Sequence, residues 1–135
     1  MTATAAAKSK VLVIDDQPGI RRLLTEVLTD EGYEVVTAGN GYEGVQRAKE
    51  VNPAVILMDM KMPGMDGIET LQELKAMRQE DRVIMMTAYG ELELVNQARE
   101  MGAYAYITKP FDIMAVCRMV AENIAGCAAS RLMIG

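Results

Sequence analysis

Five short apolar runs alternate along the chain with five longer stretches in which apolar residues recur every three or four positions. The short runs show no polar alternation, which is typical of strands buried on both faces of a sheet, whereas the longer stretches have the spacing of amphipathic helices. We predict strands at residues 11–14, 34–38, 54–58, 83–86 and 104–107, and helices at 18–30, 41–50, 66–77, 92–101 and 113–128. The second strand is the most polar, so we expect it at an edge of the sheet.

Strands that alternate with helices favour parallel β-α-β units, with helices on both faces of one sheet. Five strands fit a flavodoxin-like, doubly wound α/β fold with strand order 2-1-3-4-5. We therefore expect one domain over residues 10–128, with an amino-terminal tail at 1–9 and a carboxy-terminal tail at 129–135.

Carboxylates stand at the ends of two strands that this topology makes neighbours. Asp15 and Asp16 follow the first predicted strand, and Asp59 follows the third. Ligands of doubly wound sheets bind at this edge, between the first and third strands. Close carboxylates repel one another, and a hard divalent cation with oxygen ligands offsets that repulsion. Few protein ligands with retained waters suit Mg²⁺, so the sequence predicts a magnesium site.

Helix capping is the competing interpretation of these acidic residues. Asp15 and Asp16 could simply turn the chain and cap the first helix. Asp66 and Glu69 have the spacing of a capping box, so we predict that Asp66 caps the third helix and leave it out of the site.

Two further side chains follow the remaining strands beside the acids. Thr87 comes after the fourth strand and Lys109 after the fifth. This set suits phosphoryl transfer to a carboxylate, with Asp59 as the nucleophile. The metal and Lys109 would neutralise charge on the transferred group, and Thr87 would donate a hydrogen bond to it. A single Thr or Lys is usually solvated surface, so the signal comes from their shared position.

Composition excludes several classes of function. The 135 residues contain no histidine, which excludes a Ser-His-Asp triad, a histidine-ligated zinc site and a phosphohistidine on this chain. A formal charge of -5 offers no basic face for a nucleic acid, and the aliphatic runs are too short to cross a bilayer. Cys117 and Cys127 would lie about 15 Å apart along one helix, beyond the reach of a disulfide. Free thiols favour a reducing compartment, so we expect a cytoplasmic protein without nucleic-acid or membrane partners.

Four motifs together resemble the receiver domain of two-component response regulators, the CheY-like family. They are Val11-Leu12-Val13-Ile14-Asp15-Asp16, Met58-Asp59-Met60-Lys61-Met62-Pro63-Gly64-Met65-Asp66-Gly67, Met86-Thr87-Ala88 and Thr108-Lys109-Pro110-Phe111. The resemblance covers Lys10 to about Gly126. Within the family the motifs are similar to those of single-domain regulators of sporulation phosphorelays, and receivers of nitrogen-regulator-type transcription factors share part of the pattern.

The resemblance implies a role for each matching residue. Asp59 would accept a phosphoryl group from the phosphohistidine of a sensor histidine kinase or a histidine phosphotransferase. Asp16, Asp59 and the backbone carbonyl of Lys61 would bind Mg²⁺ directly, and Asp15 would act mainly through water. Lys109 would contact the phosphoryl group.

A conformational switch and a path for hydrolytic water are also implied by the resemblance. Thr87 would move toward the phosphoryl group while the ring of Tyr106 turns inward, although without the family Tyr106 could equally be a core aromatic. Lys61 and Tyr89 would flank the path of the water that hydrolyses the phosphoryl bond.

A docking surface is expected around Asp59. The predicted topology surrounds this residue with Gly19 and Ile20 on the first helix and with Pro110 and Phe111 after the fifth strand. The alternative is that Ile20 and Phe111 pack inward. We expect a monomer or weak dimer that acts on partner proteins through this surface.

Two other functions stay open. An aspartyl-nucleophile phosphatase would want an Asp-x-Asp pair on the first strand and a general acid two residues after the nucleophile, where this chain has Lys61. A stand-alone receiver of a chemotaxis-like or nitrogen-regulator-like pathway, or one that works without phosphorylation, is the other. The methionines near Asp59, from Met58 to Met65, are interpreted as core packing.

Overall fold

A computed structural model describes residues 8–88 and 90–134, and the predicted amino-terminal tail lies outside them except for residues 8 and 9. The elements are β1 (Lys10–Ile14), α1 (Pro18–Asp30), β2 (Glu34–Ala38), α2 (Gly41–Val51), β3 (Val55–Asp59), α3 (Gly67–Ala76), a 3-10 turn (Glu80–Arg82), β4 (Val83–Thr87), α4 (Leu92–Glu100), β5 (Ala105–Thr108) and α5 (Ile113–Ile134). All ten predicted strands and helices are present, with ends that mostly differ by one residue.

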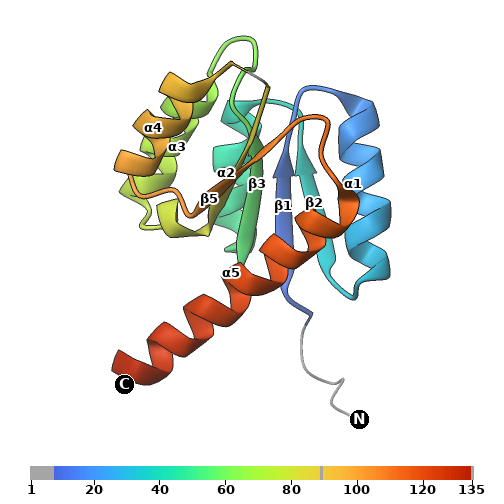
Figure 1. The fold of residues 1–135 in the computed structure, drawn as a ribbon, viewed down its shortest axis with the longest axis vertical. Coiled ribbons are helices and arrows are strands. Elements are labelled where there is room, and N and C mark those ends of the chain that lie inside the picture. The colour runs from blue at the N-terminus through green and yellow to red at the C-terminus, as the bar shows by residue number, and fades with distance from the viewer. Residues whose placement is uncertain (1–7, 89, 135) are drawn as a thin grey trace.

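The five strands form one parallel sheet in the order β2-β1-β3-β4-β5, which confirms the predicted fold and the edge position of β2 (Figure 1). β1 and β3 are neighbours in register, with Ile14 opposite Met58. The residues that follow these two strands therefore emerge side by side at the carboxyl edge of the sheet.

Each face of the sheet has its own hydrophobic core. Alternate residues of β1 point to opposite faces, with Leu12 and Ile14 on one and Val11 and Val13 on the other. The first face is covered by α2, α3 and α4, and the second by α1 and α5. The absence of polar alternation in the strands is thus explained by burial on both sides.

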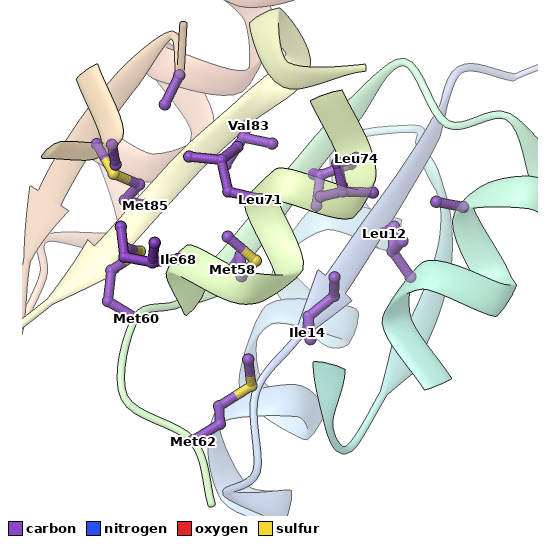
Figure 2. Packing of buried hydrophobic residues seen from close by; sticks show 14 of the residues in the cluster. Leu12, Ile14, Met58, Met60, Met62, Ile68, Leu71, Leu74, Val83 and Met85 are labelled. Atoms are coloured by element: carbon purple, nitrogen blue, oxygen red, sulfur yellow. The ribbon is translucent and has the colours of Figure 1, made fainter. Parts of the chain in front are cut away.

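The methionines before and after Asp59 pack in the first core. Met58, Met60 and Met62 are at most 6% exposed and belong to this core; Met58 lies near Leu71, and Met60 lies near Ile68 (Figure 2). Met65 is only partly buried. Core packing was the predicted role of these residues, and unbranched thioether side chains suit an irregular space beneath a loop.

Helix starts follow local signals in the sequence. Asn40 caps α2 by accepting a hydrogen bond from the backbone of Glu43. Asp66 and Glu69 form the predicted capping box at the start of α3. Each cap fixes the residue at which its helix begins. The cap of α3 therefore also fixes the end of the loop that follows Asp59.

The last helix is longer than predicted. It was expected to end near residue 128, with a tail over 129–135, but α5 continues to Ile134 and leaves the sheet (Figure 1). Residues 127–134 contain no glycine or proline, so no local signal ends the helix there. Within the part of the chain that the structure describes, no helix is long and apolar enough to cross a membrane.

Candidate active site at the carboxyl edge of the sheet

Three carboxylates converge where β1 and β3 end. Asp15, Asp16 and Asp59 each offer one oxygen, and these oxygens all lie within 4.8 Å of one another. Asp15 is fully buried, Asp59 is 8% exposed and Asp16 is exposed. The predicted cluster is therefore assembled by the parallel pairing of β1 with β3.

Helix capping does not explain the two acids after β1. The residue at the cap position of α1 is Gln17, which makes no capping hydrogen bond through its side chain, and Pro18 begins the helix. The Asp15 carboxylate does turn the chain, because its Oδ1 accepts a hydrogen bond of 2.8 Å from the Gln17 backbone. Asp16 is left facing solvent beside the other two carboxylates, an arrangement that suits a cation ligand.

Lys109, which follows the edge strand β5, contacts the carboxylates at the ends of β1 and β3. Its Nζ lies 3.1 Å from Oδ2 of Asp15 and 3.5 Å from Oδ1 of Asp59. The lysine follows β5, and its backbone N–H donates a 2.7 Å hydrogen bond to the carbonyl of Thr87 at the end of β4. This bond fixes the starting point of the side chain that reaches across to β1 and β3.

The ionised form of the Asp59 carboxyl is disfavoured in the metal-free site. Burial raises the pKa of its carboxyl from 3.8 to about 6, Lys109 opposes this rise, and the charge of Asp15 adds to it. The backbone N–H of Lys61 donates to Oδ1 over 3.4 Å. A further cation at this point would favour the ionised form of Asp59.

The donors present fit a magnesium ion. They are carboxylate oxygens of mixed exposure, and the open side at Asp16 leaves room for waters, which Mg²⁺ retains. Lys109 offsets only one of the three negative charges of the ionised cluster. A divalent cation would supply the remainder.

The predicted switch residues line one hollow. Thr87 is 2% exposed at the end of β4, and Tyr106 is 41% exposed on β5. Both border a space of about 350 Å³ together with the loop before α4. Tyr106 is therefore not a core aromatic in this conformation.

The predicted docking residues surround a second hollow beside Lys109. Ile20, Pro110 and Phe111 line a largely apolar space of about 390 Å³. Gly19 is exposed next to it, while Ile20 and Phe111 are only partly exposed because they also pack against the core under α1. Ile20 and Phe111 thus divide between the core and the surface, and docking of a partner on them stays a prediction.

Sequence reasoning missed two residues of this edge. Leu23, one helical turn after Ile20, lines the docking hollow and is 39% exposed. Its spacing of three residues from Ile20, one helical turn, was a usable signal. Glu91 contacts Lys61 and the backbone of Ala88, and no sequence motif announces this contact between two loops.

Comparison with known proteins agrees with this geometry. The family described as the response regulator receiver domain matches residues 11–121. The chain belongs to this family. It is 48% identical over 104 residues to sporulation initiation phosphotransferase F of Bacillus subtilis (strain 168), covering 77% of this chain and 84% of that protein. A receiver domain protein from Clostridium thermocellum superimposes with a TM-score of 0.85 at 31% identity, covering 90% of this chain and 98% of that one.

Some receiver relatives are longer than this chain. The regulatory protein AtoC of Escherichia coli (strain K12) is 38% identical over 107 residues, which is 79% of this chain but only 23% of AtoC.

The receiver family takes part in two-component and phosphorelay signalling, binds Mg²⁺ through an acidic cluster like this one, and interacts with histidine kinases or phosphotransferases.

Proposed function

We propose that this receiver accepts a phosphoryl group on Asp59 from the phosphohistidine of a sensor histidine kinase or histidine phosphotransferase, and then passes it on or signals by a conformational change. One observation carries the proposal: the Asp59 carboxylate lies at the edge of the sheet with two more carboxylates within 4.8 Å and the Lys109 ammonium 3.5 Å away. An intact set of this kind favours a phosphorylated receiver over one that works without phosphorylation.

The transfer exchanges one bond of phosphorus for another. A carboxylate oxygen of Asp59 attacks phosphorus, and the bond between phosphorus and the histidine nitrogen breaks, with the electron pair returning to the imidazole ring. Lys109 neutralises charge on the transferred oxygens, and Thr87 donates a hydrogen bond to one of them. Asp16, Asp59 and the backbone carbonyl of Lys61 would hold Mg²⁺, with Asp15 acting through water, and the ion would supply further charge neutralisation.

A partner must bring its histidine to Asp59, because this chain has none. The hollow beside Lys109, lined by Ile20, Leu23, Pro110 and Phe111, offers an apolar surface next to the reacting carboxylate. We propose it as the docking surface, with Gly19 at its border leaving space for a helix of the partner. The relative from B. subtilis, a phosphotransferase of sporulation, supports a phosphorelay over a chemotaxis pathway.

The switch is proposed for the hollow bounded by Thr87 and Tyr106. A threonine hydroxyl drawn toward a phosphoryl group on Asp59 would vacate space beneath the loop before α4. The exposed ring of Tyr106 would then turn into that space.

Transfer from histidine is tested with a sensor kinase that has been autophosphorylated with labelled ATP and freed of nucleotide. Mixing it with this protein and Mg²⁺ should move the label onto the receiver, and Asp59→Asn should leave the label on the kinase. Retention of the label by several different kinases and phosphotransferases, with the wild-type receiver folded and loaded with Mg²⁺, would contradict the proposal.

A further inference from the structure

An ion pair joins two loops beside the proposed phosphorylation site. The Oε2 atom of Glu91, the residue before α4, lies 3.4 Å from Nζ of Lys61 in the loop after β3. The Oε1 atom of the same carboxylate accepts a 2.7 Å hydrogen bond from the backbone N–H of Ala88. One carboxylate thus holds together two loops that belong to different β-α units.

Among the described residues, this pair differs from the two ion pairs that lie on helix surfaces. Arg22–Glu26 and Arg47–Glu50 each join residues one turn apart on a helix, and all four side chains are at least 45% exposed. The Glu91 side chain is only 7% exposed, whereas Lys61 is 72% exposed. A carboxylate withdrawn from water depends on its two donors, so its contacts are held more firmly than those of a solvated pair.

The pair lies directly beside the reacting group. Lys61 is anchored at its backbone by the N–H that donates to Oδ1 of Asp59, and at its side chain by Glu91. Ala88 follows Thr87, the residue proposed to contact the phosphoryl group. Lys61 therefore links Asp59, through its backbone, to the loop after β4, through its side chain.

We propose that Glu91 is a positioning residue that holds Lys61 across the approach to Asp59 and thereby slows the loss of a phosphoryl group to water. This inference rests on the proposed function. In the hydrolysis, a water oxygen bonds to phosphorus, the bond between phosphorus and the Asp59 oxygen breaks, and the carboxylate leaves with the electron pair. The products are the Asp59 carboxylate and inorganic phosphate, which carries the protons of the water or releases one to solvent.

The test measures how long the phosphoryl group stays on the full chain. Protein labelled with acetyl phosphate and Mg²⁺ is freed of the donor, and the decay of the labelled form is followed by intact mass. Glu91→Gln keeps an oxygen for the Ala88 N–H but loses the charge that holds Lys61, so decay should be about two- to fivefold faster. Lys61→Met should have a similar effect, and Lys61→Arg should keep the slow decay.

Coupling between the two residues separates positioning from a general effect on the loop. Adding Glu91→Gln to Lys61→Met should cause no further acceleration, because the pair is already broken. Glu50→Gln, which breaks the exposed pair with Arg47, is the matched control and should leave the decay unchanged.

Each outcome decides between the two claims. Failure of acetyl phosphate to label folded wild-type protein would overturn the proposed function itself. Normal labelling with equal decay of Glu91→Gln and Glu50→Gln would overturn the role of Glu91 alone. The role of Glu91 would also be overturned if Glu91→Gln accelerated the decay equally in wild type and in the Lys61→Met variant. The effect of Glu91 would then not act through the lysine.

Discussion

The chemistry of single residues at this site follows from a shortage of positive charge. Asp15 is fully buried and its carboxylate contacts the Gln17 backbone and Lys109, while Asp59 shares the same ammonium group. Without a metal, one lysine serves two buried carboxylates. Repulsion between the carboxylates therefore destabilises the metal-free site, and a bound cation would reduce that repulsion. The stability of the protein should thus depend on pH and on Mg²⁺.

The raised pKa of Asp59 predicts how stability changes with pH in metal-free protein. The folded state holds its proton up to a pH of about 6, whereas an unfolded chain releases it near a pH of about 4. The contribution of Asp59 to stability is therefore present at low pH and is lost as the pH rises through 6. Asp59→Asn lacks this titration, so the variant should gain up to about 3 kcal/mol over wild type between pH 4 and pH 7.5.

Denaturant melts of both proteins in chelator, at several pH values, measure this difference. The stability gap should widen with increasing pH and should narrow when Mg²⁺ is added to the wild type. A gap that stays constant across the range would show that burial does not penalise the Asp59 carboxylate.

At the scale of elements, the starts of α2 and α3 are fixed by helix caps that can be recognised in the sequence. The Asp66–Glu69 box at the start of α3 was predictable from spacing alone, as was Asn40 at the start of α2. Contacts between loops were not. The Glu91–Lys61 pair depends on the side-chain directions of two separate loops, and sequence spacing carries no such information.

The capping role of Asp66 predicts a loss of stability without a loss of chemistry. Asp66→Ala leaves the first turn of α3 without its side-chain acceptor and should lower the free energy of unfolding by about 1 kcal/mol. Labelling of Asp59 by acetyl phosphate should persist. Glu73→Ala, at an exposed position of the same helix, is the control and should change stability by less than about 0.5 kcal/mol. Loss of labelling in a folded Asp66→Ala protein would mean that Asp66 belongs to the site.

The docking surface at the start of α1 and in the loop after β5 should matter for phosphoryl transfer from a protein and not for labelling by a small phosphoryl donor. Ile20→Ala, Leu23→Ala and Phe111→Ala should each slow phosphoryl transfer with a protein partner by about tenfold, as expected for truncated apolar anchors. Acetyl phosphate needs no docking surface, so labelling by it should be retained. Tyr104→Ala, at the opposite end of β5 and 44% exposed, should affect neither. Equal slowing with acetyl phosphate would show that these residues support the active site and do not dock a partner.

At the scale of the whole molecule, the alternation of buried strands with amphipathic helices was enough to predict the doubly wound sheet. The strand order does not follow from the alternation; it was predicted as the commonest arrangement of five such strands, and the structure confirms it. That order alone brings Asp15 and Asp59 together from positions far apart in the chain. The length of α5 was not predictable by the same means, because residues 127–134 contain no glycine or proline to mark an earlier end. The hollows beside Lys109 and Thr87 also required the structure, since they depend on how partly buried side chains divide between core and surface.

The central claim is that the assembled carboxyl edge makes Asp59 a metal-dependent phosphoryl acceptor. Its most direct test treats wild type and Asp59→Asn with acetyl phosphate, each in Mg²⁺ or in chelator, and maps the modified residue by mass spectrometry. We predict one phosphoryl group, on Asp59, in wild type with Mg²⁺ only. Full labelling in chelator, or labelling that persists in Asp59→Asn, would contradict the account.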